Sequence, residues 1–407
     1  MKISIAYTAT GVMLLQQALS SMSGFALQVL MPSIAADTGI SPYLIGVYVP
    51  LLYAGSMVSS ILAGGLLLRL GAFRVGQICL LTTGLGMLLC LQGDLALFVI
   101  GGLVIGLGNG PSTPAGSHVL SRYTTRTNAA MLYSLKQTGV PVGGMIAGVL
   151  LPLLALSFGW RGALIGAALL CLAFVAIFQP LRREFDSDRQ PGRSLRMMDV
   201  RATLTTVLRE SRYRELAIAI CVFTGLQVIF ASFFVSFLSE RLGWSNAEAG
   251  FVYSIAMVSG IGFRILWGWL AARFLAPTYM LAILGAGMAT AVFGISLVEP
   301  GWHIYAIWAA ALLFGATGIG FQGVLLAEVA RIAPPGMAGV ITGGTVFFAF
   351  VGMIVFPALF GAILSAGLSY ETAFAASGVL PLLVAMMLFF ATRRRGPDST
   401  GIPERTD

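Results

Sequence analysis

Charged residues are scarce in this 407-residue chain. They make up 10% of it, hydrophobic residues make up 57%, and the mean hydropathy is +0.91. A soluble domain carries about 25% charged residues. The composition therefore excludes a soluble globular protein and indicates an integral membrane protein.

Cysteine and histidine are also rare. The four cysteines, Cys79, Cys90, Cys171 and Cys221, fall in apolar runs without paired spacing, so we interpret them as packing residues rather than disulfide or metal partners. The sequence shows no pair of nucleophile and base, no metal-spaced set of His and Cys, and no phosphate-binding loop. We therefore expect neither an enzyme nor a bound cofactor or metal.

Negative charge is missing from the apolar runs. Lys136 is the only lysine after Lys2, and it lies in a run apolar enough to cross a membrane, while Arg264 lies at a comparable depth in another run. No Asp or Glu lies clearly within any such run. Ionisable residues inside a bilayer are functional-site candidates by default. Two cations without an acid therefore indicate a site for an anion.

The chain is rich in apolar runs of roughly 20 residues, the length that crosses a hydrocarbon core of about 30 Å as a helix. Six precede a polar stretch, at residues 8–31, 43–67, 75–93, 96–119, 129–153 and 160–180. Six follow it, at residues 216–238, 248–272, 278–298, 303–326, 338–363 and 372–392. The pattern predicts an all-α membrane protein with twelve transmembrane helices in two sets of six.

The basic residues predict the orientation, because Lys and Arg are retained on the cytoplasmic side. With the N-terminus inside, twenty of the twenty-four basic residues fall in cytoplasmic segments. Only Arg161 and Arg241 fall on the extracellular side, and Lys136 and Arg264 lie within spans. We therefore expect a multi-pass protein of the cell's inner membrane with both termini in the cytoplasm. The net charge of +8 follows from this topology, and no nucleic-acid partner is needed.

The two halves of the chain repeat each other. A shift of 204 residues carries Gly64 and Arg69 onto Gly268 and Arg273. Between the halves, a polar stretch holds nine arginines and six acidic residues. The predicted domains are an N-terminal six-helix bundle (1–180), a cytoplasmic linker (181–215), a C-terminal six-helix bundle (216–392) and a cytoplasmic tail (393–407).

Twelve spans in a six-plus-six repeat with a basic linker resemble the major facilitator superfamily over essentially the whole chain. The segment that begins at Gly64 and contains Leu66, Arg69 and Gly71 is similar to the family's loop motif after the second helix. The resemblance implies gating roles for residues of this loop and of its repeat, namely Gly64, Arg69, Gly71, Gly268 and Arg273.

The sequence departs from the family's pattern at two positions, one in this loop and one in the fourth helix. Leu68 stands where the loop motif has Asp, and Gly102 stands where the fourth helix usually has Arg. Both partners of a polar latch of the family are therefore missing here.

Glycine and proline cluster in the fifth span. Gly139, Pro141, Gly143 and Gly144 resemble a motif associated with antiporters, with the spacing compressed by one residue. Small residues allow close helix approach, and proline opens a backbone hydrogen bond. Gating between moving bundles and ordinary helix packing both explain these residues, and we assign them a gating role as a hypothesis.

Arg264 shares one helical face with Tyr253, Met257 and Gly260, at spacings of four, three and four. This mixed face favours an arginine that faces a cavity over one that snorkels to the interface. Arg264, four residues before Gly268, resembles the substrate-contacting Arg of monocarboxylate and oxalate/formate carriers. Gly260 stands where monocarboxylate carriers have an Asp, which argues against proton handling at that position.

The superfamily's fifth and eighth helices face each other, so the resemblance places Lys136 and Arg264 on one central cavity. A bound carboxylate would relieve the repulsion between the two cations. A deprotonated Lys136 stays an alternative. The other predicted substrate-binding residues are polar side chains of the spans, namely Gln16, Gln17, Tyr53, Ser60, Asn109, Tyr253, Gln227 and Gln322.

The sequence predicts a secondary active transporter that moves a small organic anion, such as a carboxylate, by alternating access. The expected partners are the lipid bilayer and either a coupled proton or a counter-anion, and we expect a monomer. An exporter of drugs or hydrophobic metabolites, with the two cations in gating or packing, is the alternative. A membrane receptor or scaffold is disfavoured, because the repeat and the glycine-rich helices suit moving bundles.

Overall fold

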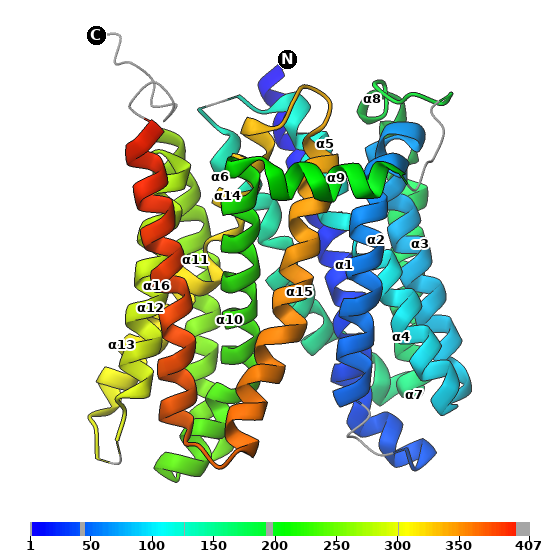
Figure 1. Cartoon of the computed structure of the whole chain (residues 1–407). Helices are drawn as coiled ribbons and strands as arrows, with labels where there is room; N and C mark the ends of the chain where they lie inside the picture. The colour runs from blue at the N-terminus through cyan, green and yellow to red at the C-terminus, as the bar shows by residue number, and fades with distance from the viewer. Residues whose placement is uncertain (1, 41–44, 126, 193–197, 300, 396–407) are drawn as a thin grey trace. The chain divides into compact units, whose positions relative to one another are not determined.

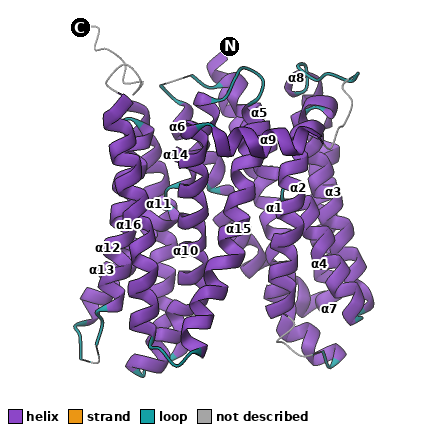
Figure 2. Ribbon diagram, viewed as in Figure 1, coloured by secondary structure: helices purple, strands orange, loops and turns teal. Residues whose placement is uncertain are grey.

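A computed structural model (Figure 1) describes residues 2–40, 45–125, 127–192, 198–299 and 301–395. Every regular element among these residues is helical, and no strand occurs in them (Figure 2). The prediction of an all-α protein is confirmed. The four cysteines are free, and Cys79, Cys90 and Cys171 are buried, as expected for packing residues.

Eleven helical stretches among the described residues are long and apolar enough to cross a membrane. One of them, Ala129–Phe185, contains 57 residues and is too long for a single crossing. Its backbone leaves the helical region at Gly159, where φ is 69° and ψ is 170°. Positive φ is accessible to glycine without strain, so Gly159 separates the fifth span from the sixth. This break accounts for the twelve predicted helices.

In the first half of the chain, the fourth and the fifth spans are each divided, the fifth at Thr138. The fourth span is broken at Gly110 and Pro111 into two helices that the sequence had suggested as one. The elements are α1 (Lys2–Thr38), α2 (Ile45–Leu70), α3 (Ala72–Leu89), η2 (Cys90–Gln92), α4 (Leu95–Asn109), α5 (Ser112–Tyr123), α6 (Ala129–Gln137) and α7 (Gly139–Phe178).

The linker between the halves is partly helical. It contains η3 (Gln179–Leu181), α8 (Arg182–Phe185) and α9 (Met198–Arg209), and residues 193–197 lie outside the described part. In α9, Val207 is buried and Arg201 is exposed, as in an amphipathic helix. The next helix begins at Ser211, within the predicted linker.

The second half repeats the pattern of the first, including a divided span. The tenth span passes from a regular helix through a π-helical turn and a tight turn into a second helix. The elements are α10 (Ser211–Leu242), α11 (Asn246–Arg273), α12 (Pro277–Ser296), α13 (Ile304–Phe314), η4 (Gly315–Ile319), α14 (Gln322–Ile332), α15 (Ala338–Ser365) and α16 (Tyr370–Arg395).

The described helices group into two compact units. Each unit includes a short segment from the other half of the sequence. Unit 1 comprises residues 1–124, 136–209 and 330–347, and unit 2 comprises residues 125–135, 210–329 and 348–407. The bundle boundaries inferred from the sequence stay predictions. Most of the predicted tail, residues 396–407, lies outside the described part of the chain.

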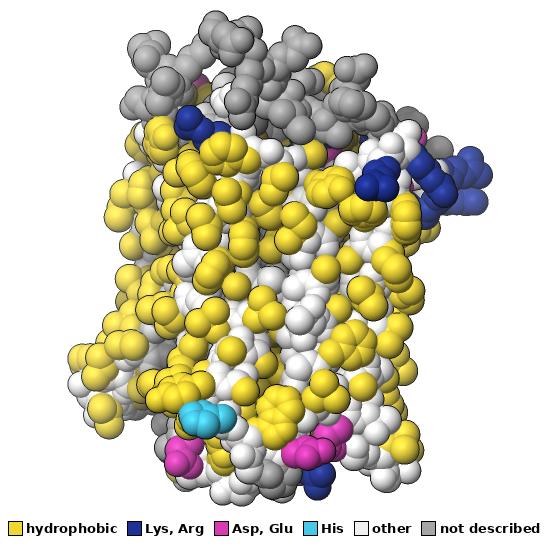
Figure 3. All heavy atoms as spheres, turned by 90° about the vertical axis from the view of Figure 1, so that its left-hand side faces the viewer, with side chains coloured by type: hydrophobic (Ala, Val, Ile, Leu, Met, Phe, Trp, Pro, Cys, Tyr) yellow, Lys and Arg dark blue, Asp and Glu magenta, His cyan; other side chains and the backbone are white. Residues whose placement is uncertain are grey.

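The outer surface is apolar at the depth of the spans. Val149, Leu153 and Leu156 of α7 are 65%, 56% and 85% exposed, a pattern that suits contact with lipid. On the face turned towards the viewer in Figure 3, a broad hydrophobic band lies between two rims that carry charged side chains. This distribution fits a protein that spans a membrane.

Candidate functional site

Lys136 lies inside unit 1 with an exposed fraction of only 1%. Its Nζ donates hydrogen bonds to Oε1 of Gln17 at 2.7 Å and to Oε1 of Gln137 at 2.9 Å. The chain makes room for the ammonium group at Gly116, where a Cβ atom would lie 2.5 Å from Cε of Lys136. A lysine buried to this degree does not snorkel to the interface.

Two glutamines of α1 link the lysine to α5. Ser112 donates to Oε1 of Gln16 at 3.0 Å and lies 3.4 Å from Oε1 of Gln17, which also accepts from Thr113 at 3.3 Å. These hydroxyl groups lie in the first turn of α5, directly after the break in the fourth span. The polar cluster around Lys136 therefore lies next to that break.

Arg264 of α11 lies inside unit 2, and it is also 1% exposed. Its Nη2 and Nε donate to the carbonyl oxygen of Ile319 at 2.5 and 3.2 Å, and Nη2 lies 3.4 Å from Oε1 of Gln322. The side chain is directed into the unit, so the snorkelling alternative does not describe this structure.

The acceptor of Arg264 is the end of a helix. The last carbonyl groups of a helix have no partner within it and carry a partial negative charge. Ile319 closes the π-helical turn η4, and α14 begins only at Gln322. The break in the tenth span thus provides neutral oxygen atoms that stabilise a buried cation.

The other predicted substrate-binding residues are distributed over both units. In unit 1, Ser20 donates to Oδ1 of Asn109 at 2.9 Å, and Ser60 bonds to the carbonyl of Met57 in its own helix. In unit 2, the ring of Tyr253 stacks on Phe230 at 5.8 Å between centroids.

Two predicted residues, Tyr53 and Gln227, are half-buried in α2 and α10. Lys136 and Arg264 belong to different units, and their action on one cavity stays a prediction.

The glycines of the fifth span pack against α1. A Cβ atom at Gly139 would lie 2.6 Å from the carbonyl oxygen of Leu14, and one at Gly143 would lie 2.8 Å from Cβ of Ser21. At Gly144 the nearest atom, of the Phe25 ring, is at an ordinary 3.4 Å. Close packing is therefore required at Gly139 and Gly143. A gating role for these residues and for the half-buried Pro141 stays a prediction.

The glycines of the two repeated loops also lie at close approaches. Gly64 faces Val340 of α15 within unit 1, and Gly268 faces Ser134 of α6 within unit 2. Their basic neighbours Arg69 and Arg273 are exposed. Arg273 lies 5.8 Å from the centroid of the Phe274 ring.

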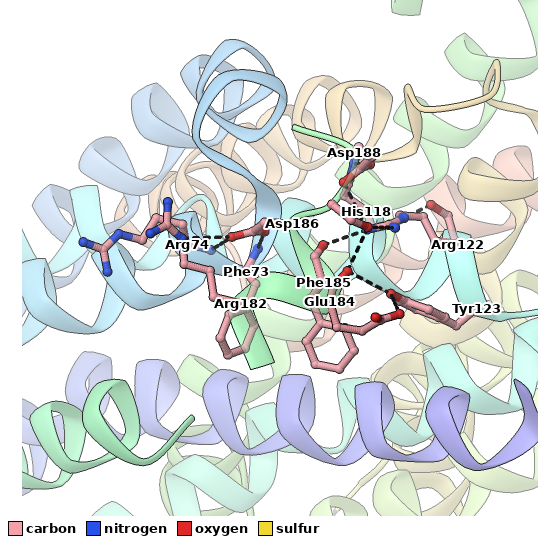
Figure 4. Close-up of polar contacts among 12 residues, drawn as sticks. Phe73, Arg74, His118, Arg122, Tyr123, Arg182, Glu184, Phe185, Asp186 and Asp188 are labelled. Carbon is pink, nitrogen blue, oxygen red and sulfur yellow. Dashed lines mark hydrogen bonds and ion pairs between the residues drawn. The ribbon is translucent and has the colours of Figure 1, made fainter. Parts of the chain in front are cut away.

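A segment of the linker, residues 184–190, forms a polar cluster that sequence reasoning missed (Figure 4). We call this segment the linker clip. Asp186 accepts from the backbone N–H groups of Phe73 and Arg74 at 2.7 and 3.0 Å, and so caps α3, which follows Gly71 at φ 97°. Burial raises the pKa of Asp186, although these N–H groups and Arg182 act in the opposite direction.

The second anchor of the linker clip is Asp188. It bonds to Nε2 of the buried His118 at 2.8 Å and to Nη1 of Arg122 at 3.0 Å, both from α5. Burial acts to raise the pKa of Asp188, but the hydrogen bond with His118 and the charge of Arg122 outweigh it and lower the pKa.

The clip also reaches the family's loop motif, because the N–H of Gln190 donates to the carbonyl of Leu68 at 2.7 Å. The signal that could have revealed the clip is the alternation of Glu184, Asp186 and Asp188 directly after the sixth span.

Comparisons with known proteins agree with this architecture. The family model described as Major Facilitator Superfamily matches residues 13–357. A gentisate transporter of Corynebacterium glutamicum is 24% identical over 371 residues, which cover 88% of this chain and 81% of that protein. A probable hexose phosphate transport protein of Chlamydia muridarum is 24% identical over 356 residues, which cover 79% of this chain and 77% of that protein.

A solved structure, that of the E. coli fucose:proton symporter, superposes with a TM-score of 0.75 at 18% identity. The match covers 96% of this chain and 99% of the symporter chain. The fold predicted from the sequence, a twelve-helix bundle of the superfamily type, is confirmed.

Proposed function

The chain belongs to the Major Facilitator Superfamily, whose members are multi-pass membrane transporters and not enzymes, and on this premise we propose that it carries a small organic anion with a carboxylate as its charged group. The chain is a secondary transporter. The observation that carries the proposal is the burial of Lys136 and Arg264, each 1% exposed within a span.

The charge balance of the spans supports an anionic substrate. All sixteen acidic residues lie in loops, in the linker, in the tail or within five residues of a helix end. The hydrogen bonds of Lys136 and Arg264 described above go to neutral amide and carbonyl oxygens. Electrostatic attraction is stronger in the protein interior than in water, so a buried basic side chain favours an anionic substrate.

The names of two relatives also favour an anion. Gentisate is a carboxylate, and a hexose phosphate carries a phosphate group. The relatives reported above are named for an aromatic carboxylate, a sugar phosphate and an uncharged sugar, so the proposal is an organic anion in general and not the monocarboxylate or oxalate class in particular.

We assign roles to the residues of the proposed site. Arg264 and Lys136 bind the charged group, and Gln16, Gln17 and Gln322 orient it through hydrogen bonds. Because the acidic residues lie near the helix ends rather than in the middle of the spans, we propose coupling through a proton on the substrate or through a counter-anion.

The test is uptake into proteoliposomes of gentisate, glucuronate and glucose 6-phosphate, with L-fucose as the uncharged control. We expect saturable uptake of at least one anion, and we expect Arg264→Gln to abolish it while thermal unfolding in detergent shows an intact fold. Repeating the assay with and without a pH gradient separates proton coupling from anion exchange. Normal anion uptake by Arg264→Gln, or uptake of L-fucose alone, would refute the proposal.

A further inference from the structure

The broken tenth span is held to α11 by two side chains, of which the proposed function uses only one. Arg264 donates to the carbonyl of Ile319, the last residue of η4. Three residues later in α11, the indole Nε1 of Trp267 donates to the carbonyl of Ala316 at 2.7 Å. Both acceptors belong to the same π-helical turn.

Carbonyl groups at the end of a helix need partners from outside the helix. In η4 the residues Gly315–Ile319 are all buried, so water does not supply these partners. Side-chain donors from α11 take that place. Single π-helical turns are also frequent at functional sites. The hydrogen bonds that hold this turn can therefore matter for function as well as for packing.

The fit of Trp267 depends on a glycine of the break. A Cβ atom at Gly320 would lie 2.8 Å from Cδ1 and 3.2 Å from Nε1 of the indole. Glycine at this position therefore leaves room for the indole beside the end of η4. The Phe263 ring lies 5.3 Å from the indole, centroid to centroid, on the same helix.

The backbone of α11 also approaches η4 closely, one turn before Arg264. A Cβ atom at Gly260 would lie 2.5 Å from Cβ of Ile319 and 3.0 Å from the carbonyl oxygen of Gly315. The turn is thus fixed against α11 by a close contact at Gly260 and by the indole hydrogen bond at Trp267. Arg264 lies between these two points.

We infer that Trp267 is a positioning residue for Arg264. Its N–H holds Ala316, and this keeps η4 in the register in which the carbonyl of Ile319 faces the guanidinium group. The inference rests on the proposed function, because it concerns the group that binds the anion. A guanidinium held by both Nε and Nη2 on one oxygen has a fixed plane, and a fixed donor binds a carboxylate with less loss of entropy.

The first experiment compares Trp267→Phe, which removes the N–H and keeps an aromatic ring, with Trp269→Phe on the same helix. Trp269 is 42% exposed, so it is a matched control for the loss of one indole. In proteoliposomes with gentisate as the probe, Trp267→Phe should raise KM about two- to tenfold, the loss of one hydrogen bond. It should leave kcat within about twofold, and Trp269→Phe should change neither value.

The second experiment does not depend on the substrate. A cryo-EM structure of Trp267→Phe should show the guanidinium of Arg264 displaced from the carbonyl of Ile319. An unchanged contact, or an unchanged KM for gentisate, overturns the inference. If Arg264→Gln transports normally, the proposed function fails instead, and the structure of Trp267→Phe still decides whether Trp267 positions Arg264.

Discussion

At the scale of single residues, the proposed anion site depends on Lys136 and Arg264, two basic side chains that are buried within spans. Lys136 is held by the amide oxygens of Gln17 and Gln137, and Arg264 by the carbonyl of Ile319. Neutral oxygens reduce the cost of burying a charge without neutralising it. We propose that an anion binds at these two side chains.

Replacing Lys136 by Met should separate function from stability. The substitution keeps the length of the side chain and removes the buried charge, and exchange of buried ionic groups for apolar ones is often neutral or stabilising. We expect Lys136→Met to unfold at the same temperature as the native protein or higher, and to lose anion uptake. Thermal unfolding in detergent and proteoliposome uptake measure the two effects.

The control for this variant is Leu132→Met, an apolar exchange in the same helix at a buried position. It should retain uptake. A marked loss of thermal stability in Lys136→Met, with uptake of the remaining folded protein intact, would show that the lysine is structural.

At the scale of helices, the contact between α1 and α7 depends on two glycines. A Cβ atom at Gly143 would lie 2.8 Å from Ser21 and 2.9 Å from the backbone of Met22, whereas one at Gly148, further along α7, meets no atom within 4 Å. Gly143 and Gly148 therefore form a matched pair, since both are glycines of α7 and only Gly143 packs closely against α1.

Gly143→Ala should destabilise the protein by about 1–3 kcal/mol, the usual effect of overpacking, because the new methyl group meets α1. Gly148→Ala should be neutral or slightly stabilising, since alanine favours the helix. Thermal unfolding of the two variants measures the difference. Equal stability of both variants would mean that α1 and α7 do not pack as described.

Hydropathy predicted the spans but not the breaks inside them. The mean hydropathy over about 20 residues is the same whether the fourth span is interrupted at Gly110 or continues as one helix. The π-helical turn at Gly315–Ile319 depends on donors from α11, and the cap of α3 on Asp186 depends on a residue more than a hundred positions away. Such features follow from contacts between elements, which a single sequence does not display.

At the scale of the whole molecule, the 204-residue repeat and the distribution of arginines were the most informative signals. They predicted twelve spans and a division near residues 181–215, and the family match supports a two-part transporter. The residues of the anion site were inferred in part from resemblance. The hydrogen bond between Lys136 and Gln17 was not predicted. Trp267 was not predicted either, because an indole in a span usually indicates packing.

The orientation of the chain in the membrane is also a property of the whole molecule, and it stays a prediction. Basic residues near the termini should keep both ends of the chain in the cytoplasm. A green fluorescent protein fused to the C-terminus should fluoresce in E. coli cells, and alkaline phosphatase inserted after Gly301 should be active. An active phosphatase at the C-terminus would contradict the orientation.

We propose that Lys136 and Arg264 bind the same anion. Calorimetric titration of gentisate into the native protein, Lys136→Gln, Arg264→Gln and the double variant tests it most directly. We predict that each single variant weakens binding about tenfold or more, as for hydrogen bonds to charged groups, and that the double variant loses less than the product of the two losses. Native affinity in both single variants, or losses that multiply as for independent sites, would contradict the account.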